Sequence, residues 1–142
     1  MGYRYRMLLE ASALLHEIGT FVSTRAYHKH TYYLVANSEI YGLTRTEVAI
    51  VANVARYHRR SAPKPTHPEY ISLSQEHRIA VNKLAALLRL AKVLDVSDIR
   101  NVDQLTIRVS GNVLTLRIPG MSETSLAKRS LEVRSDFMED VY

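Results

Sequence analysis

The amino-acid sequence predicts a mainly α-helical domain followed by a small β-hairpin and a C-terminal helix. Up to about residue 98, apolar residues recur at the three- and four-residue spacing that is typical of helices. Beyond that point they alternate with polar residues, as in strands that bury one face. We therefore expect a helical domain over residues 1–98 and a small α+β subdomain over residues 99–142.

The first helix is expected from about Tyr3 to Ile18. Its apolar residues lie at helical spacing, and Gly19 follows them as a C-terminal cap. This assignment places His16 and Glu17, two titratable residues at the end of an apolar segment, in the last turn. Because burying such groups without partners is costly, the pair needs hydrogen-bond partners or a chemical role.

Two shorter helices are expected next. The second helix is predicted over about residues 30–38, where Asn and Ser end it. The third begins at Thr44, which forms a capping box with Glu47 three residues later, and it ends near His58. Positive charge near His58 suits the C-terminal end of that helix.

A proline-rich loop leads to the longest helix. Residues 61–68 contain three prolines and are expected to form an extended loop. Ser72 and Gln75 form a second capping box, which opens a helix to about Asp95. The dense apolar stripe of this helix predicts that it is the central core helix.

The terminal subdomain is expected to contain a hairpin over about residues 104–118 and a helix over about residues 122–141. Gly111 and Asn112 suit a two-residue turn between the strands. With that turn, apolar residues face each other across the strands, namely Val109 and Leu114, Ile107 and Leu116, and Leu105 and Ile118. One face of the hairpin is therefore entirely apolar.

The composition excludes several classes of protein. Hydrophobic residues make up 46% of the 142 residues, enough for one compact core. No cysteine is present, which excludes disulfides, zinc–cysteine sites and thiol catalysis and fits the cytoplasm. No apolar run is long enough to span a bilayer, and polar residues soon after the basic N-terminus argue against a signal peptide.

Positive charge is concentrated in one part of the chain. The formal net charge is +5, and residues 22–64 contain seven lysines and arginines against two glutamates, which accounts for the whole excess. Such a concentration suits phosphates and other polyanions. The candidate anion-binding residues, called the cationic cluster below, are His28, Lys29, His30, Arg56, His58, Arg59 and Arg60. The alternative is a solvated helix end with one or two salt bridges.

Several segments match one known family in order and spacing. They are LLEASALLHEIG at residues 8–19, YHKHTYYL at 27–34, NS at 37–38, RYHR at 56–59, and LAALLRLA followed by LD over 84–95. Through them the chain resembles the C-terminal region of the exopolyphosphatase / guanosine pentaphosphate phosphohydrolase (Ppx/GppA) family. The hairpin and final helix are similar, less specifically, to the small terminal subdomain of that family.

The resemblance implies a role within a longer protein. Members of the family are cytoplasmic phosphohydrolases that act on inorganic polyphosphate or guanosine pentaphosphate, and an N-terminal actin-like module with a divalent metal carries out catalysis. Nothing in this sequence resembles the phosphate loops of that module. We therefore expect an accessory C-terminal domain that is inactive alone, contributes a basic surface for the phosphates and has a candidate homodimer contact. Neither a membrane nor nucleic acid is the expected partner.

The same region is similar to the HD-domain metal-dependent phosphohydrolases, which are helical bundles. This resemblance implies a candidate metal-binding set made of His16, Glu17, His30, His58 and Asp95. Nitrogen and oxygen ligands would suit manganese, iron or zinc. Glu17 replaces the usual aspartate, however, and the first histidine of the motif would lie before Met1.

The altered HD motif leaves three interpretations. A self-sufficient metal-dependent HD phosphohydrolase is one alternative, and a pure oligomerisation module is another. Because one ligand is absent and one is changed, we favour a vestigial polar cluster that ties helix ends together. No cofactor is assigned on this interpretation, and a divalent metal at this cluster is the weaker hypothesis.

Overall fold

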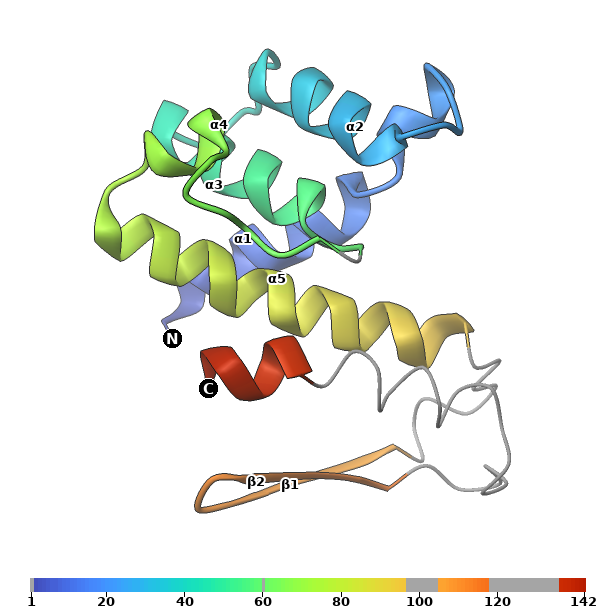
Figure 1. Ribbon diagram of the computed structural model, residues 1–142, viewed down its shortest axis with the longest axis vertical. Helices are drawn as coiled ribbons and strands as arrows, with labels where there is room; N and C mark the ends of the chain where they lie inside the picture. The colour runs from blue at the N-terminus through green and yellow to red at the C-terminus, as the bar shows by residue number, and fades with distance from the viewer. Residues whose placement is uncertain (1, 60, 97–104, 118–135) are drawn as a thin grey trace.

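The computed structural model describes residues 2–59, 61–96, 105–117 and 136–142 (Figure 1). In chain order the elements are α1 (Tyr3–Leu15), the 3₁₀ helix η1 (Ile18–Phe21), α2 (Tyr27–Ala36), α3 (Arg45–Arg56), α4 (Pro68–Ile71), α5 (Gln75–Val96), β1 (Thr106–Ser110) and β2 (Val113–Arg117). A final helix occupies residues 136–141. The predicted fold class is confirmed. No helix within the described ranges has the length and apolar character needed to cross a bilayer.

Helix α3 lies at the centre of the helical body, where α1, α2 and α5 pack against it (Figure 1). Residues 50–55 are all buried, so the helix has no solvated face along this stretch. The longest helix, α5, contributes Leu84 and Leu88 to the core as predicted, but the helix against which the others pack is α3 and not α5. The core therefore surrounds α3.

The capping box at the start of α3 is confirmed. Thr44 Oγ1 accepts a hydrogen bond from the Glu47 backbone nitrogen, and the Thr44 backbone nitrogen donates to Glu47 Oε2 at 2.8 Å. Arg4 of α1 donates to the same carboxylate oxygen at 2.7 Å. This side-chain hydrogen bond is the main reason why the pKa of Glu47 falls to about 2.

The first helix ends earlier than its sequence pattern predicts. Helix α1 stops at Leu15, so His16 and Glu17 follow the helix instead of forming its last turn. Gly19 is a buried residue of η1 and does not cap α1. A β-carbon at Gly19 would lie 2.1 Å from the carbonyl oxygen of Tyr27. Glycine is therefore required here because η1 packs closely against the start of α2.

Two other helix starts differ from the prediction. Helix α2 begins at Tyr27, three residues before the expected start, after Ala26 adopts a left-handed conformation with φ of 53°. Helix α5 is capped by Ser74, whose Oγ accepts a hydrogen bond from the His77 backbone nitrogen at 3.3 Å. The expected cap, Ser72, instead donates to a carbonyl of α4.

The expected proline-rich loop is confirmed over residues 61–67, and only its last residue, Pro68, is helical. Residues 61–64 have no regular secondary structure, whereas Pro68 opens the short helix α4. Proline suits this first helical position, because its nitrogen has no hydrogen-bonding role there.

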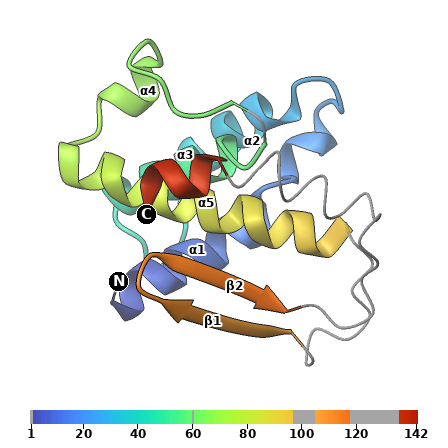
Figure 2. The ribbon, with the colours of Figure 1, turned by 60° about the horizontal axis from the view of Figure 1, so that its bottom comes forward.

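The register of the hairpin is confirmed. Val109 pairs with Leu114 and Ile107 with Leu116, around the turn at residues 111–112. The third expected pair includes Ile118, which lies outside the described residues. Figure 2 shows the hairpin as a ribbon beside the helical body, and nearly all of its strand residues are exposed.

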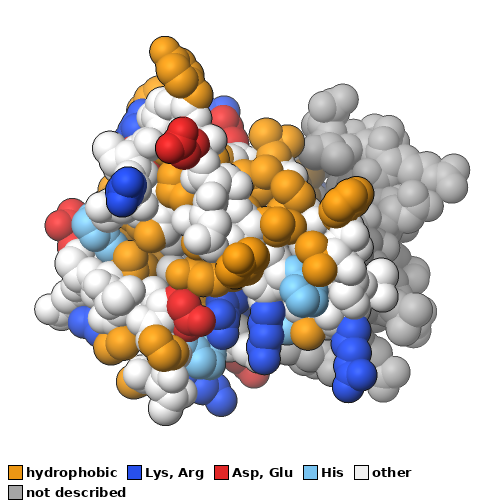
Figure 3. All heavy atoms as spheres, turned by 90° about the horizontal axis from the view of Figure 1, so that it is seen from above, with side chains coloured by type: hydrophobic (Ala, Val, Ile, Leu, Met, Phe, Trp, Pro, Cys, Tyr) orange, Lys and Arg blue, Asp and Glu red, His pale blue; other side chains and the backbone are white. Residues whose placement is uncertain are grey.

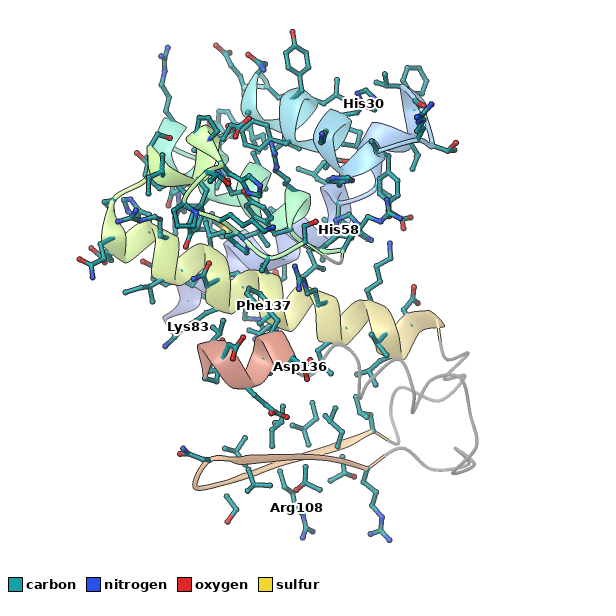
Figure 4. All side chains as sticks on the ribbon, viewed as in Figure 1. His30, His58, Lys83, Arg108, Asp136 and Phe137 are labelled. Atoms are coloured by element: carbon teal, nitrogen blue, oxygen red, sulfur yellow. The ribbon has the colours of Figure 1, made fainter. Side chains whose placement is uncertain are left out.

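The final helix packs on α5 (Figure 4). Phe137 contacts the hydrophobic core, and its ring lies 4.3 Å from the guanidinium carbon of the buried Arg89. Tyr142 lies beside Lys83, further back along α5. Of the helix expected over residues 122–141, the part before residue 136 lies outside the described residues, as does the expected domain boundary at residues 98–99.

Candidate anion-binding site

The start of α2 meets the residues that follow α3 through Tyr27 and His58. The Tyr27 hydroxyl lies 3.0 Å from Nε2 of His58, and Nδ1 of the same ring is hydrogen-bonded to the Ala55 carbonyl. A neutral His58 satisfies both contacts, because Nδ1–H donates and Nε2 accepts. Burial lowers the pKa of His58 to about 4, and the ring is fully buried. His58 is therefore a neutral structural residue at pH 7.

The His16–Glu17 pair is partnered by a lysine from α5. Lys92 Nζ donates to Glu17 Oε1, and it also donates to the Tyr27 hydroxyl oxygen at 3.3 Å. The hydrogen bond from Lys92 is the main reason why the pKa of Glu17 lies below its ordinary value. His16 Nε2 lies 3.5 Å from the same Glu17 oxygen, and the His16 ring packs edge-on against His58.

A threonine of α2 fixes the backbone around this pair. The hydroxyl of the buried Thr31 accepts a hydrogen bond from the Gly19 nitrogen at 3.0 Å and donates to the His16 carbonyl at 3.1 Å. This contact holds the segment after α1 against α2. The segment that carries His16 and Glu17 is therefore fixed through its backbone, although the Glu17 side chain is exposed.

The candidate metal ligands are only partly gathered. His16, Glu17 and His58 lie in the contacts described above, whereas His30 is on α2 and Asp95 is exposed on α5. In the described part of the chain, no three His, Asp or Glu side chains form a group that could hold a metal ion. Both ring nitrogens of His58 already have protein partners.

Much of the cationic cluster gathers around His28. Burial lowers the pKa of His28, and the charges of Arg59, Arg56, Lys29 and His30 lower it further, in that order. Figure 3 shows lysine and arginine side chains together with histidines along one edge of the face seen there. Nδ1 of His28 is buried and has no hydrogen-bond partner within the described residues. Arg60 lies outside the described residues.

The two described arginines of the cluster have different environments. Arg56 is mostly buried and donates to Glu69 of α4 at 3.2 Å, so its charge is already paired. Arg59 is exposed, and its guanidinium carbon lies 4.9 Å from the centre of the Tyr27 ring. Among the described residues of the cationic cluster, Arg59 and the exposed Lys29 are therefore the lysine and arginine open to an external anion.

Sequence reasoning missed Lys92 and Tyr27. Lys92 follows the buried Leu88 by four residues, so it lies on the same side of α5. A lysine that interrupts an apolar stripe was the available signal, because it needs an anionic or polar partner nearby. Tyr27 belongs to the matched segment at residues 27–34, but nothing in the sequence indicated its contact with His58.

Nearly the whole chain matches the model of one known protein family. The model of Ppx/GppA phosphatase, domain III, matches residues 2–139. The chain belongs to the Ppx/GppA phosphatase family. The match includes the helical body, the hairpin and part of the final helix, so all of them are parts of this Ppx/GppA domain III.

Two curated relatives of this domain III carry the name guanosine-5'-triphosphate,3'-diphosphate pyrophosphatase. The protein from Pseudoalteromonas translucida (strain TAC 125) is 32% identical over 111 residues, which are 78% of this chain and 22% of that relative. The protein from Vibrio vulnificus (strain YJ016) is 28% identical over 141 residues, 95% of this chain and 27% of the relative. The chain therefore spans about a quarter of the length of these relatives.

Proposed function

We propose that this domain III binds the phosphate chain of inorganic polyphosphate or guanosine pentaphosphate for a catalytic module carried elsewhere in a longer cytoplasmic protein. The domain itself does not hydrolyse phosphoanhydrides. Residues 1–98 supply the anion-binding face, and residues 99–142 form a distinct subdomain. A homodimer contact is a further role for the domain.

The observation that carries this proposal is the pair of exposed cations, Lys29 and Arg59, whose charges both act on His28. Arg59 packs on the Tyr27 ring at the C-terminal side of α3, and Lys29 is exposed in the first turn of α2. His28 lies next to Lys29, and burial together with the positive charges of Arg59, Arg56 and Lys29 lowers the pKa of His28, which shows that these charges act on the same place. Two fixed cations with flanking imidazoles suit neighbouring phosphoryl groups of one chain.

Other members of the cationic cluster support these cations. Arg56 is paired with Glu69 and holds α4 against α3, and its guanidinium lies over Tyr32. His58 is neutral and anchors Tyr27, on which Arg59 lies. On this proposal, Arg56 and His58 act through the residues they position, while Lys29 and Arg59 contact the anion.

Charge reversal at the exposed cations tests the proposal. We expect Lys29→Glu combined with Arg59→Glu to weaken binding of labelled inorganic polyphosphate, measured by fluorescence anisotropy, by at least about tenfold. The residual affinity should depend less on salt. The matched control is Arg108→Glu combined with Arg117→Glu, which changes the net charge equally on the exposed hairpin, where Arg108 points away from the helical body (Figure 4).

The control separates the proposal from its alternatives. Equal weakening by both double variants would mean that only net charge matters, and no weakening by either would favour an oligomerisation module. Release of phosphate from polyphosphate by this chain, lost in His16→Ala, would instead show a self-sufficient phosphohydrolase. Metal analysis of protein purified without chelators accompanies that assay.

A further inference from the structure

Two basic side chains converge on one carboxylate oxygen of Glu17. Lys92 Nζ donates to Oε1, and His16 Nε2 lies 3.5 Å from the same atom. A carboxylate oxygen and a phosphoryl oxygen accept the same kind of charge-assisted hydrogen bond from lysine and protonated histidine. The fold therefore stabilises an oxyanion at this position, and the chain's own Glu17 supplies it.

The basic partners are fixed more firmly than the carboxylate. The Lys92 side chain is 18% exposed and is also held by the Tyr27 hydroxyl, while Nδ1 of His16 is bonded to the Ala13 carbonyl at 2.6 Å. The Glu17 side chain, by contrast, is 57% exposed. Rotation of Glu17 into solvent would leave Lys92 and His16 in place as an unoccupied anion-binding site, which is called the anion seat below.

We propose that Lys92 and His16 bind one phosphoryl group of the polyanion when Glu17 rotates away, so that Glu17 is an internal competitor which limits the affinity. This inference rests on the proposed function, because the phosphoryl group belongs to the same phosphate chain. Arg59 and Lys92 both lie against the ring of Tyr27, which joins this anion seat to the exposed cations. A phosphoryl group can carry two negative charges, so it competes effectively with a single carboxylate.

The test measures binding of inorganic pyrophosphate and of polyphosphate by calorimetry. We expect Glu17→Gln to tighten the binding of both by about fivefold, the scale of one partly exposed ion pair. In a Lys92→Gln background, Glu17→Gln should not increase the affinity, because the cation for which Glu17 competes with phosphate is absent. In a Lys92→Arg background the gain should return. Glu76→Gln, at an exposed glutamate in the first turn of α5, is the matched control and should change little.

The outcomes separate this inference from the proposed function. An equal gain from Glu17→Gln with and without Lys92, or from Glu76→Gln, would show that Glu17 acts only through net charge; the anion seat would then be wrong while the polyphosphate surface remained. Polyphosphate affinity that is unchanged when Lys29→Glu and Arg59→Glu are combined would overturn the proposed function itself. Thermal unfolding of Lys92→Gln checks that the variant is folded, and the comparison of Glu17→Gln with Glu76→Gln keeps the test valid if it is not.

Discussion

The hydroxyl of Tyr27 and Nε2 of His58 are 3.0 Å apart, although the two residues are separated by 31 positions in the sequence. This hydrogen bond joins the first residue of α2 to the segment that follows α3. Arg59 packs on the same tyrosine ring, and Lys92 donates to the same hydroxyl oxygen. Tyr27 therefore connects the buried His58, the exposed Arg59 and the ion pair between Lys92 and Glu17.

Removing the Tyr27 hydroxyl should destabilise the protein. In Tyr27→Phe, the buried Nε2 of His58 loses its donor, and we expect the free energy of unfolding to fall by about 1–3 kcal/mol. Urea denaturation followed by circular dichroism measures the change. Tyr33→Phe, at an exposed tyrosine of the same helix, is the control and should stay within about 0.5 kcal/mol of the wild type. Equal effects of the two variants would contradict the contact.

The buried His58 should make stability depend on pH. Its folded-state pKa is about 4, whereas an unfolded histidine titrates near 6.5, so the unfolded chain takes up the proton first as the pH falls. The free energy of unfolding should therefore decrease between pH 6.5 and 4, by up to about 3 kcal/mol from this group. His28 shifts in the same direction and adds to the slope.

Denaturation across this pH range identifies the contribution of His58. We expect His58→Gln to show a shallower slope between pH 6.5 and 4 than the wild type, whatever its stability at pH 7. His77→Gln, at the start of α5, should keep the wild-type slope. A slope that is the same in all three proteins would exclude His58 as its source.

Gly19 should tolerate no larger residue. A β-carbon there would lie 2.1 Å from the Tyr27 carbonyl oxygen and 2.4 Å from the Thr31 nitrogen, both of which are backbone atoms. We expect Gly19→Ala to lower the unfolding free energy by about 3 kcal/mol or to prevent folding. Gly2→Ala, where nothing lies near the new methyl group, should be close to neutral. Thermal unfolding of both variants distinguishes this packing role from the predicted helix cap.

The strained conformation of Ala26 should be relieved by glycine. Its φ of 53° lies in the left-handed region, which costs roughly 1 kcal/mol for a residue with a β-carbon. Glycine also increases the conformational entropy of the unfolded chain, and this offsets part of the stability gained by relieving the strain. We therefore expect Ala26→Gly to raise the melting temperature slightly. A clear decrease would mean that the alanine methyl group makes packing contacts which outweigh the strain.

Arg89 should be essential for attaching the C-terminal helix. Its Nε donates to the Tyr57 carbonyl at 2.7 Å, Nη2 donates to the Ser61 carbonyl, and Phe137 covers the guanidinium. We expect Arg89→Met to lower the unfolding free energy by about 3 kcal/mol, because the carbonyls of the buried Tyr57 and of Ser61 lose a charged donor. Limited proteolysis should cleave near the C-terminus sooner than in Arg78→Met, the control on the same helix. Unchanged protection would show that Phe137 docks independently.

The features that local sequence determines were predicted well. The capping box at Thr44 depends on residues three positions apart, and the pairing of Val109 with Leu114 follows from a two-residue turn. The second capping box was misplaced because Ser72 and Ser74 both offer hydroxyls near the helix start. Local sequence does not show that Ser72 is already engaged at the end of α4.

The features that depend on long-range packing could not be read from the pattern. The sequence places Lys92 75 positions from Glu17, and only the packing of α5 beside the residues after α1 brings them together. The role of Gly19 likewise depends on the approach of α2. The sequence therefore indicated which residues are candidates, but it did not predict the ion pair between Lys92 and Glu17 or the contacts of Tyr27.

The turn of the exposed hairpin offers a practical use in labelling. Residues 111–112 are exposed, lie between two exposed strands and are distant in sequence from Lys29 and Arg59. Because the protein contains no cysteine, Asn112→Cys would introduce its sole thiol. A fluorophore attached there would report on binding and tumbling of the domain without covering the residues that are proposed to hold phosphate.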